Sequence, residues 1–371
     1  MNLPVNNWEL STSGKMEPSW IGEFSTPLKF QKLEEDINAD TIIVGGGIAG
    51  MTTAYLLSMS GNKVVLLEDG YIGSGETSRT LKTVGISNAK IIEESPLSDT
   101  DISPCIQFPN QAQFQPLVYL QGLSSAMTSK FEAKIFTETH ADEVVPASAG
   151  NDDTVKVKTQ NGSTVSAENV VLATNAPIVD KKSKIYDKQQ PMRTYAIAIK
   201  VPRGAIPRAL YWDTGNQKSE EKVKPYHYIR TQRIPNDDSN ELIIVGGEDH
   251  KVGEIDKLMS EFSHFDNLYS WMAEKFSIKG IIAYDWSGQV LEPLDGLAFI
   301  GRNPGKVENI YIATGDSGNG ITHGTVAGMI ISDLILKGEN QWANVYDPSR
   351  KIRRNSKNSL RVTDRKRSKR R

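Results

Sequence analysis

Three glycines with the spacing G-x-G-x-x-G, namely Gly45, Gly47 and Gly50, lie between two short apolar runs. In such a motif the first glycine permits a tight turn and the second lets a pyrophosphate approach the backbone. The third lets a helix pack closely on a strand. The helix that follows would direct unpaired N–H groups and its positive dipole end at the phosphates. The spacing therefore predicts phosphate-binding chemistry at this turn.

The residues around the glycines predict a strand, a helix and a second strand, the order of a dinucleotide-binding unit. Apolar runs from Ile42 to Val44 and from Val64 to Leu67 flank the helix, and Gly61 ends it. Glu68 follows the second run, about 20 residues after the glycines, where a carboxylate accepts hydrogen bonds from ribose hydroxyls. The alternative interpretation is an ordinary βαβ unit without a ligand.

A second glycine-rich turn lies near the other end of the chain. Residues 309–313 read as a buried strand, and the sequence GDSGNG then opens a helix that Gly338 ends. Small residues at Ala173 and Thr174 end another buried run, where backbone could approach a ligand. We therefore expect two helix N-termini to meet one long ligand.

Composition bounds the class of protein. With 371 residues, 38% hydrophobic and 24% charged, the chain can hold two domains with a sizeable core. One cysteine, Cys105, excludes internal disulfides and Cys-rich iron–sulfur sites, and the five histidines show no metal-ligand spacing. No apolar run approaches the roughly 20 residues of a membrane span, and no secretory signal is visible. We expect a cytoplasmic protein without a metal site.

The charge is unevenly spread along the chain. The segment from Arg350 to Arg371 has twelve Lys and Arg against one acidic residue, which leaves 31 basic and 44 acidic residues elsewhere. We expect this tail (348–371) to be disordered. The favoured interpretation is a solvated extension. The alternative is contact with nucleic acid or an anionic surface.

The middle of the chain changes character. Three short strands are predicted at residues 142–146, 154–159 and 163–166, with a hairpin turn at Asn161-Gly162. From residue 192 to 248 longer alternating strands follow without crossover helices, which predicts an antiparallel sheet and a second domain. We expect an N-terminal arm (1–36), a discontinuous cofactor domain (37–185 and 285–347) and a substrate domain (186–284).

Several motifs together resemble one family. The glycine fingerprint, GETSRT, NVVLAT and NIYIATGDSGNG resemble the D-amino acid oxidase, glycine oxidase and sarcosine oxidase family, from about Trp20 to Arg350. FPNQAQFQPLVYL and DWSGQVLEPLDGLAFIG resemble a branch often fused to a Rieske domain. Here only the basic tail follows, and one cysteine could not build such a centre. The resemblance implies an α/β (α+β) fold with a Rossmann-like FAD-binding domain and an antiparallel-sheet substrate domain.

The resemblance also implies noncovalent FAD and the residues that hold it. The glycine turn would hold the pyrophosphate, Glu68 the adenosine ribose, Val144 or Val145 the adenine, and the last glycine-rich turn the flavin. The implied cofactor-binding set is Gly45, Gly47, Ile48, Ala49, Gly50, Glu68, Ser78, Arg79, Thr80, Val144, Ala173, Thr174, Gly315, Gly318, Gly320 and Ile321.

One departure from the family concerns the substrate region. Only 27 residues separate Thr80 from Phe108, where the family has a long, largely helical segment. A block of substrate-region helices is therefore expected to be missing. A truncated gene model, a natural deletion and a true minimal variant are the open explanations.

Three residues are candidates for substrate chemistry. His250, in GGEDHKVG, resembles a site histidine of sarcosine oxidase-type enzymes; the alternative is a hydrogen-bonded loop histidine. Arg193 and Tyr195 share one face of a strand and could bind a substrate carboxylate, or could simply be a wet-face Arg and a half-buried Tyr. Tyr226, Tyr228 and Arg230 alternate in the same way and have the same two interpretations.

The predicted function is oxidation of a C–N bond of a small amine or amino acid by hydride transfer to flavin. The electron acceptor would be oxygen or an unknown carrier. Two alternatives stay open. The protein could bind FAD without catalysis because the substrate region is short, or it could be a flavin-dependent nucleic-acid modification enzyme that uses the basic tail.

Overall fold

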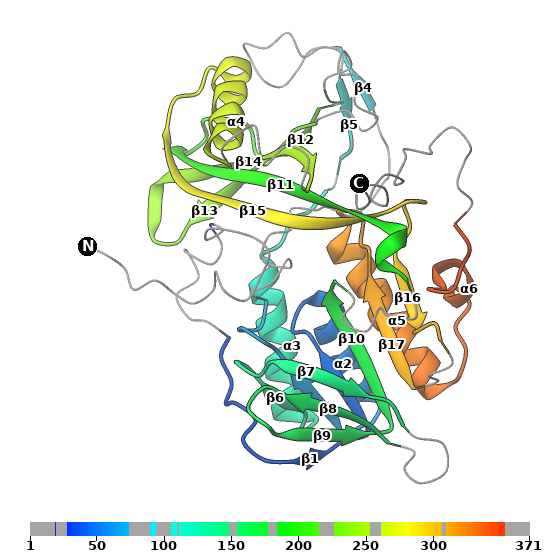
Figure 1. Cartoon of the computed structure of the whole chain (residues 1–371). Helices are drawn as coiled ribbons and strands as arrows, with labels where there is room; N and C mark the ends of the chain where they lie inside the picture. Colours follow the sequence, from blue (N-terminus) through cyan, green and yellow to red (C-terminus); the bar gives the residue numbers. More distant parts are fainter. Residues whose placement is uncertain are drawn as a thin grey trace, which may run out of the picture.

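The computed structural model places two lobes one above the other (Figure 1). It describes residue 19 and residues 28–73, 90–93, 105–109, 111–147, 154–176, 184–213, 215, 226–252, 261–305 and 309–352. The sequence-predicted sites Ser78, Arg79 and Thr80 and most of the basic tail lie outside these residues.

The lower lobe is built on a six-stranded sheet that carries the glycine fingerprint. Its strand order is β16-β17-β10-β2-β3-β6, and every neighbouring pair is parallel except the pair of β16 with β17. In that order the strands are Phe299–Arg302, Ile310–Thr314, Asn169–Asn175, Thr41–Val44, Val64–Leu67 and Lys134–Phe136. Both β2 and β3 are buried along their whole length, because each face of the sheet is covered.

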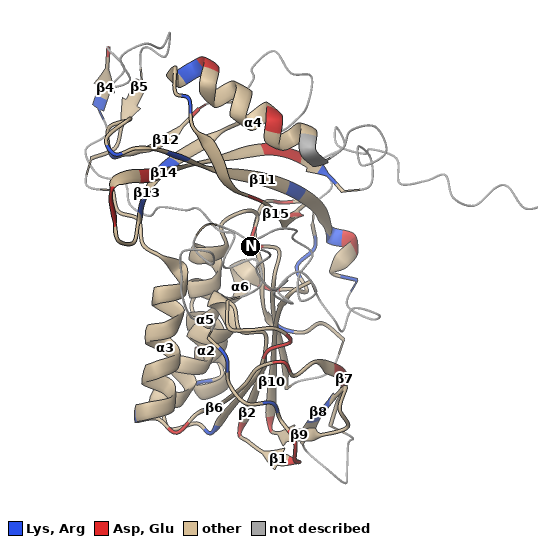
Figure 2. Cartoon of the chain, turned by 90° about the vertical axis from the view of Figure 1, so that its left-hand side faces the viewer, with Lys and Arg blue, Asp and Glu red and all other residues tan. Residues whose placement is uncertain are grey.

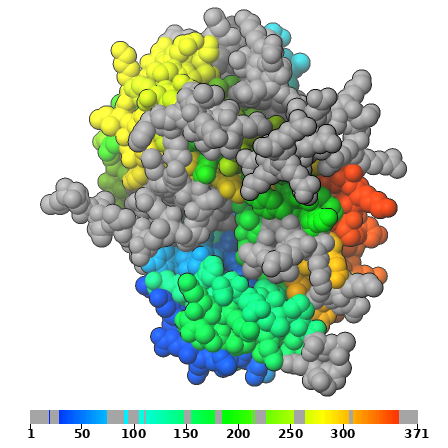
Figure 3. All heavy atoms as spheres, viewed as in Figure 1, coloured from blue at the N-terminus to red at the C-terminus, as the bar shows by residue number. Residues whose placement is uncertain are grey.

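Three helices cover one face of this sheet: α2 (Ile48–Met59), α3 (Pro116–Lys130) and α5 (Gly320–Leu336). A four-stranded sheet packs on the other face, in the order β1-β9-β8-β7. Its strands are Ile37–Asn38, Thr164–Ala167, Val155–Thr159 and Ala141–Val145. The predicted turn at Asn161-Gly162 joins β8 to β9, with Gly162 at φ +93°. Residues of β7, β8 and β9, drawn green, form part of the outer surface of the lower lobe in Figure 3.

The upper lobe is an antiparallel sheet, as the alternating pattern predicted. Its order is β12-β13-β14-β11-β15, and the strands in that order are Leu210–Trp212, Tyr228–Ile234, Asp237–Lys251, Gln189–Pro202 and Ile281–Pro293. The helix α4 (Glu261–Phe276) covers the face that points away from the lower lobe (Figure 2).

The two faces of the upper sheet bury different residues. Ile197, Ile199 and Val245 pack under α4. On the other face Ala196 and Trp286 pack with Leu117 from the start of α3. This second face therefore looks toward the lower lobe, and we call it the cofactor-facing face of the upper sheet.

The smaller elements are η3 (Tyr186–Lys188), a hairpin of β4 (Lys90–Ile92) with β5 (Cys105–Gln107), and α6 (Ala343–Tyr346). Cys105 is a free, half-buried thiol rather than a fully buried one. Within the described residues, no helix is long and apolar enough to cross a membrane. β15 runs through the expected domain boundary at 284/285, so that boundary stays a prediction.

Candidate functional site

The turn between β2 and α2 packs so tightly on neighbouring backbone that side chains do not fit. A Cβ atom on Gly45, whose φ is +111°, would lie 2.5 Å from the carbonyl oxygen of Ala173 on β10. A Cβ atom on Gly50 would lie 1.9 Å from the carbonyl oxygen of Gly45. Both approaches are shorter than any real Cβ contact, so these two positions require glycine.

The N-terminus of α2 has no side-chain cap and lines a cavity. Gly47 is the N-cap, no side chain caps the helix, and its first turn has no acidic residue. The N–H groups of the first turn of a helix have no partner within the helix. Together with the positive dipole end they suit a phosphate anion.

A second helix N-terminus lies beside the first because α2 and α5 pack closely. A Cβ atom on Gly324 would lie 2.9 Å from Cγ2 of Ile48, and one on Gly328 would lie 2.5 Å from Cγ2 of Thr52. The start of α5 also lacks a side-chain cap and an acidic residue in its first turn. The sequence predicted this meeting of two N-termini.

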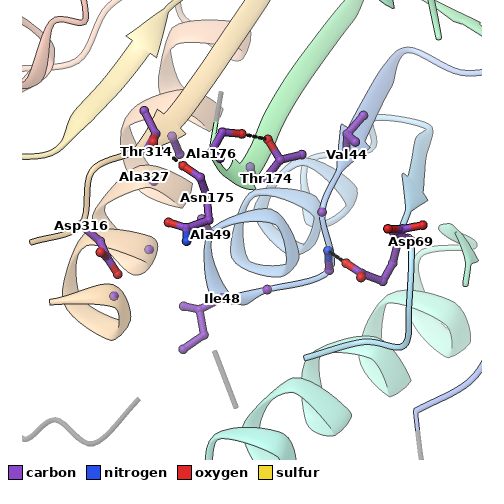
Figure 4. Close-up of a pocket in the computed structure, with 18 of the residues that line it drawn as sticks. Val44, Ile48, Ala49, Asp69, Thr174, Asn175, Ala176, Thr314, Asp316 and Ala327 are labelled. Carbon is purple, nitrogen blue, oxygen red and sulfur yellow. Dashed lines mark hydrogen bonds between the residues drawn. The ribbon is translucent and has the colours of Figure 1, made fainter. Parts of the chain in front are cut away.

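One cavity of about 380 Å³ runs past both helix starts. Figure 4 shows Ile48 and Ala49 of α2, Ala327 of α5, and Thr174 to Ala176 at the end of β10 around it. The cavity extends from Glu68 and its neighbours at one end to Asp316 and His323 at the other. Eight predicted cofactor residues line it: Gly45, Gly47, Ile48, Ala49, Glu68, Ala173, Thr174 and Gly320.

Glu68 fixes one end of the cavity through backbone hydrogen bonds. Its Oε2 accepts the N–H of Gly46 at 2.5 Å, and its Oε1 accepts the N–H of Gly70 at 3.0 Å. Each carboxylate oxygen can accept more than one hydrogen bond. The carboxylate is thus held in place and keeps the capacity to accept a hydroxyl from a ligand.

Comparison with known proteins decides the family. The sequence model of the DAO family, described as "FAD dependent oxidoreductase", matches residues 40–87 and 82–334. The chain belongs to this family of FAD-dependent oxidoreductases. The two matched pieces meet at residues 82–87, beside the place where the sequence predicted missing helices.

Individual relatives show the same fold with low identity. A Bacillus subtilis (strain 168) protein, YhfW, named as a Rieske 2Fe-2S iron-sulfur protein, is 26% identical over 410 aligned residues, which cover 91% of this chain and 76% of that protein. The L-proline dehydrogenase of P. horikoshii superposes with a TM-score of 0.67 at 20% identity, over 85% of this chain and 98% of its own. The glycine oxidase of Geobacillus kaustophilus superposes with a TM-score of 0.66 at 16% identity, over 85% of this chain and 99% of its own.

The residues of this FAD-dependent oxidoreductase fit its cofactor. The cavity offers uncapped N–H groups to a pyrophosphate at Gly47, a carboxylate to a ribose at Glu68, and a second uncapped helix start at Gly320. FAD is a long ligand whose pyrophosphate lies between its adenosine ribose and its flavin, as the start of α2 lies between Glu68 and the start of α5 along the cavity. The fit therefore rests on the donor set of the cavity as well as on the family.

Five predicted cofactor residues do not line the cavity. Gly50 acts in packing, and Ile321 is 8% exposed in the core beneath α5. Gly315 and Gly318 adopt φ of +73° and +61° and so shape the turn before α5. Val144 packs between the two sheets of the lower lobe. Direct contact of these residues with FAD stays a prediction.

The sequence reasoning missed several cavity residues. Asp69, Thr139, His140, Asn175, Gln289 and Asp316 all line the cavity. Asp69 and Asn175 directly follow Glu68 and Thr174 at strand ends, where ligands of parallel sheets bind, and this signal could have found them. Gln289 lies on β15, which the sequence pattern did not predict.

The structure places two of the three substrate candidates under α4. Tyr195 is 1% exposed and His250 5% exposed, and both rings stack with His264 of α4, at centroid distances of 4.3 and 4.9 Å. They therefore lie on the face of the upper sheet that α4 covers, away from the cavity. Arg193 is half-buried and lies opposite Gln289 in the register of β11 with β15.

Proposed function

We propose that the protein oxidises a C–N bond of a small amine or amino acid, with noncovalently bound FAD as cofactor. The observation that carries this proposal is the cavity between two uncapped helix starts in a chain of the FAD-dependent oxidoreductase family. The solved structures with the same fold support the substrate class, since their names include a proline dehydrogenase and a glycine oxidase.

Bound FAD would supply the acceptor for a hydride from the substrate. The chain's own residues would bind and orient the partners. Gly45, Gly47 and the start of α2 would hold the pyrophosphate, and Glu68 the ribose. The start of α5 at Gly320 would stabilise negative charge that gathers at the far end of the cavity.

The substrate would lie between that end of the cavity and the upper sheet. Arg193 pairs in register with Gln289, which lines the cavity, and with His250, which packs under α4, so its role as a substrate ligand stays a prediction. A guanidinium there could bind a carboxylate in bidentate fashion. For His250 and Tyr195, whose rings pack under α4, a direct substrate role stays a prediction that this placement does not favour.

The absorbance spectrum of the purified protein followed by anaerobic titration tests the proposal. We expect a yellow protein whose visible flavin absorbance is lost on addition of some amine or amino acid. Reoxidation by air or by an added quinone would then tell an oxidase from a dehydrogenase. A yellow protein that no amine in a broad panel bleaches would contradict the proposed function.

A second candidate is an FAD-binding protein that does not turn over substrate. The break of the family match at residues 82–87 favours it, as does the alignment with the Bacillus protein. That alignment spans 410 positions, more than the 371 residues of this chain. The aligned region of the relative thus contains residues that this chain lacks. Reduction by dithionite but by no amine would support this candidate.

A cytoplasmic location, inferred from the single cysteine, stays a prediction. The role of the basic tail, inferred from its charge, stays a prediction as well.

A further inference from the structure

A β-bulge in the upper sheet separates two neighbouring carboxylates. Arg193 of β11 pairs with His250 of β14, whereas Tyr195 pairs with Gly247, so Glu248 and Asp249 both lie against the single residue Thr194. Glu248 adopts a φ of +56°, in the left-handed region. A bulge of this kind changes the face to which the following side chain points.

Glu248 points to the face that α4 covers. Its Oε2 accepts the Nδ2–H of Asn267 at 3.1 Å and lies 3.5 Å from Nδ1 of His264, both on α4. Its Oε1 lies 3.7 Å from Nε2 of His227. This carboxylate therefore joins α4 to the sheet through Asn267, with two histidines close by.

Asp249 points to the cofactor-facing face of the upper sheet. Its carboxyl and the hydroxyl of Tyr228 both hydrogen-bond with the side chain of Thr194. The Tyr228 ring lies flat on Gly246, where a Cβ atom would come within 2.2 Å of it. Gly246 is also the register partner of Ala196, which packs with Trp286 and Leu117 on that face.

Within the described residues, no Lys or Arg forms an ion pair with Asp249. Its Oδ1 is buried and has no hydrogen-bond partner. Burial raises the pKa of Asp249 to about 6, the Thr194 hydrogen bond opposes the rise, and the charges of Glu292 and Glu248 add to it. His227 is the one charged group nearby that lowers this pKa. Tyr226 and Tyr228 complete the neighbourhood, and burial raises the pKa of each.

The same acidic neighbourhood extends to the turn that precedes α5. Oε2 of Glu292, on β15, accepts the hydroxyl of Ser317 at 2.5 Å. Ser317 belongs to the glycine-rich turn whose next helix opens on the cofactor cavity. A buried carboxylate without a counter-charge is costly unless a cation pairs with it. The ligand group that would pair with Asp249 is therefore cationic.

We propose that Asp249, beside Thr194, binds the ammonium group of the substrate amine and accepts one of its protons. The inference rests on the proposed function and names the charge state in which its substrate arrives. An O–H bond forms on the Asp249 carboxylate as one N–H bond breaks, and the electron pair of that bond stays on nitrogen. The neutral amine is the form whose lone pair can assist loss of hydride from the adjacent carbon.

The test compares wild type with Asp249→Asn, loaded with FAD, for binding of tetramethylammonium, a cation that has no N–H bond and so gives up no proton. Binding is measured anaerobically by perturbation of the flavin spectrum and by calorimetry. We expect the affinity to fall by about tenfold or more in Asp249→Asn, because a charged partner is lost. Glu248→Gln is the matched control: its carboxylate lies one residue away on the opposite face, and its affinity should stay within about twofold of wild type.

A wild-type measurement makes the test independent of how Asp249→Asn folds. Protonation of Asp249 removes the negative charge, so cation affinity should fall as the pH drops through about 6. This fall in affinity with decreasing pH should persist in Glu248→Gln and vanish in Asp249→Asn. If the same pH dependence remains in Asp249→Asn, it is caused by another group, such as His227, and the inference is overturned.

The remaining outcomes separate the inference from the proposed function. If amines bleach wild type and Asp249→Asn equally, and both bind the cation alike, the proposed function stands and the inference fails. If no amine bleaches wild type but the cation binds through Asp249, the site stands and the proposed function fails. Absence of cation binding by wild type overturns the inference directly.

Discussion

Replacing Gly328 with alanine tests whether the close packing of α5 on α2 sets the cofactor cavity. The new Cβ would lie 2.5 Å from Cγ2 and 2.9 Å from Cβ of Thr52. Thr52 is buried, and rotation of its side chain could move Cγ2 but not Cβ, which would stay 2.9 Å from the new atom. The two helices must therefore separate, and overpacking of this kind costs about 1–3 kcal/mol.

Part of that cost is offset, because alanine favours a helix over glycine by about 1 kcal/mol. We expect a net loss of up to about 2 kcal/mol in the free energy of unfolding. FAD affinity should also weaken, since both helix starts that face the cavity move. Gly122→Ala is the matched control: Gly122 is an exposed helix residue of α3 with nothing within 4 Å of its added Cβ.

Urea unfolding without FAD measures the stability of both variants, and quenching of flavin fluorescence measures the FAD dissociation constant. The Gly122→Ala variant should be more stable than wild type by about 0.5–1 kcal/mol and bind FAD normally. If Gly328→Ala matches it in both stability and FAD affinity, the contact between α2 and α5 does not set the cavity, and the reasoning is refuted.

Three further predictions use other contacts. Glu68→Gln should weaken FAD binding by about tenfold, since a charge-assisted hydrogen bond becomes a neutral one; fluorescence quenching measures it, and unchanged affinity would exclude the ribose contact. Arg350→Ala should lower the free energy of unfolding by about 1–3 kcal/mol, because the guanidinium donates hydrogen bonds to the carboxylate of Asp295 and to several carbonyl oxygens. The control is Arg203→Ala, at an exposed position, which should show no measurable loss of stability. Burial opposes ionisation at His227 and Glu248, but it is outweighed by the hydrogen bond of His227 with Asp213, that of Glu248 with Asn267, and the attraction between the two opposite charges, so the pKa of His227 is raised and that of Glu248 lowered. This pair stabilises the fold most between about pH 4.5 and 6.5, above the unfolded pKa of Glu and below that of His. In urea unfolding, the stability should fall as the pH rises through the folded pKa of His227. The fall should be smaller in Glu248→Gln.

The dinucleotide-binding unit could be predicted from sequence almost residue by residue. The strands at Thr41–Val44 and Val64–Leu67 and the helix between them follow from local signals: short apolar runs, glycines and a helix stop. Gly45 and Gly50 are required by contacts within or next to this unit. Secondary structure that is determined by neighbouring residues in the chain can be predicted from a single sequence.

The strand β15 was missed for the opposite reason. Its sequence, residues 281–293, mixes charged, small and aromatic residues without clean alternation. What makes it a strand is its pairing with β11, nearly along its whole length, from a position about ninety residues earlier in the chain. Propensity at such a position is overridden by tertiary context. The loss of Gln289 from the predicted site follows from the loss of this strand.

The bulge at Glu248 explains why the sequence pointed to His250 rather than to Asp249. In an unbroken strand, Gly246, Glu248 and His250 would share a face, and Gly246 lies on the cofactor-facing face under Tyr228. The extra residue shifts the alternation by one, so that Gly246 and Asp249 share this face and His250 turns under α4. A shift of one residue in the register thus places Asp249, rather than His250, on the face where the substrate is expected. Because the bulge is defined by pairing between β14 and β11, neither strand alone could reveal it.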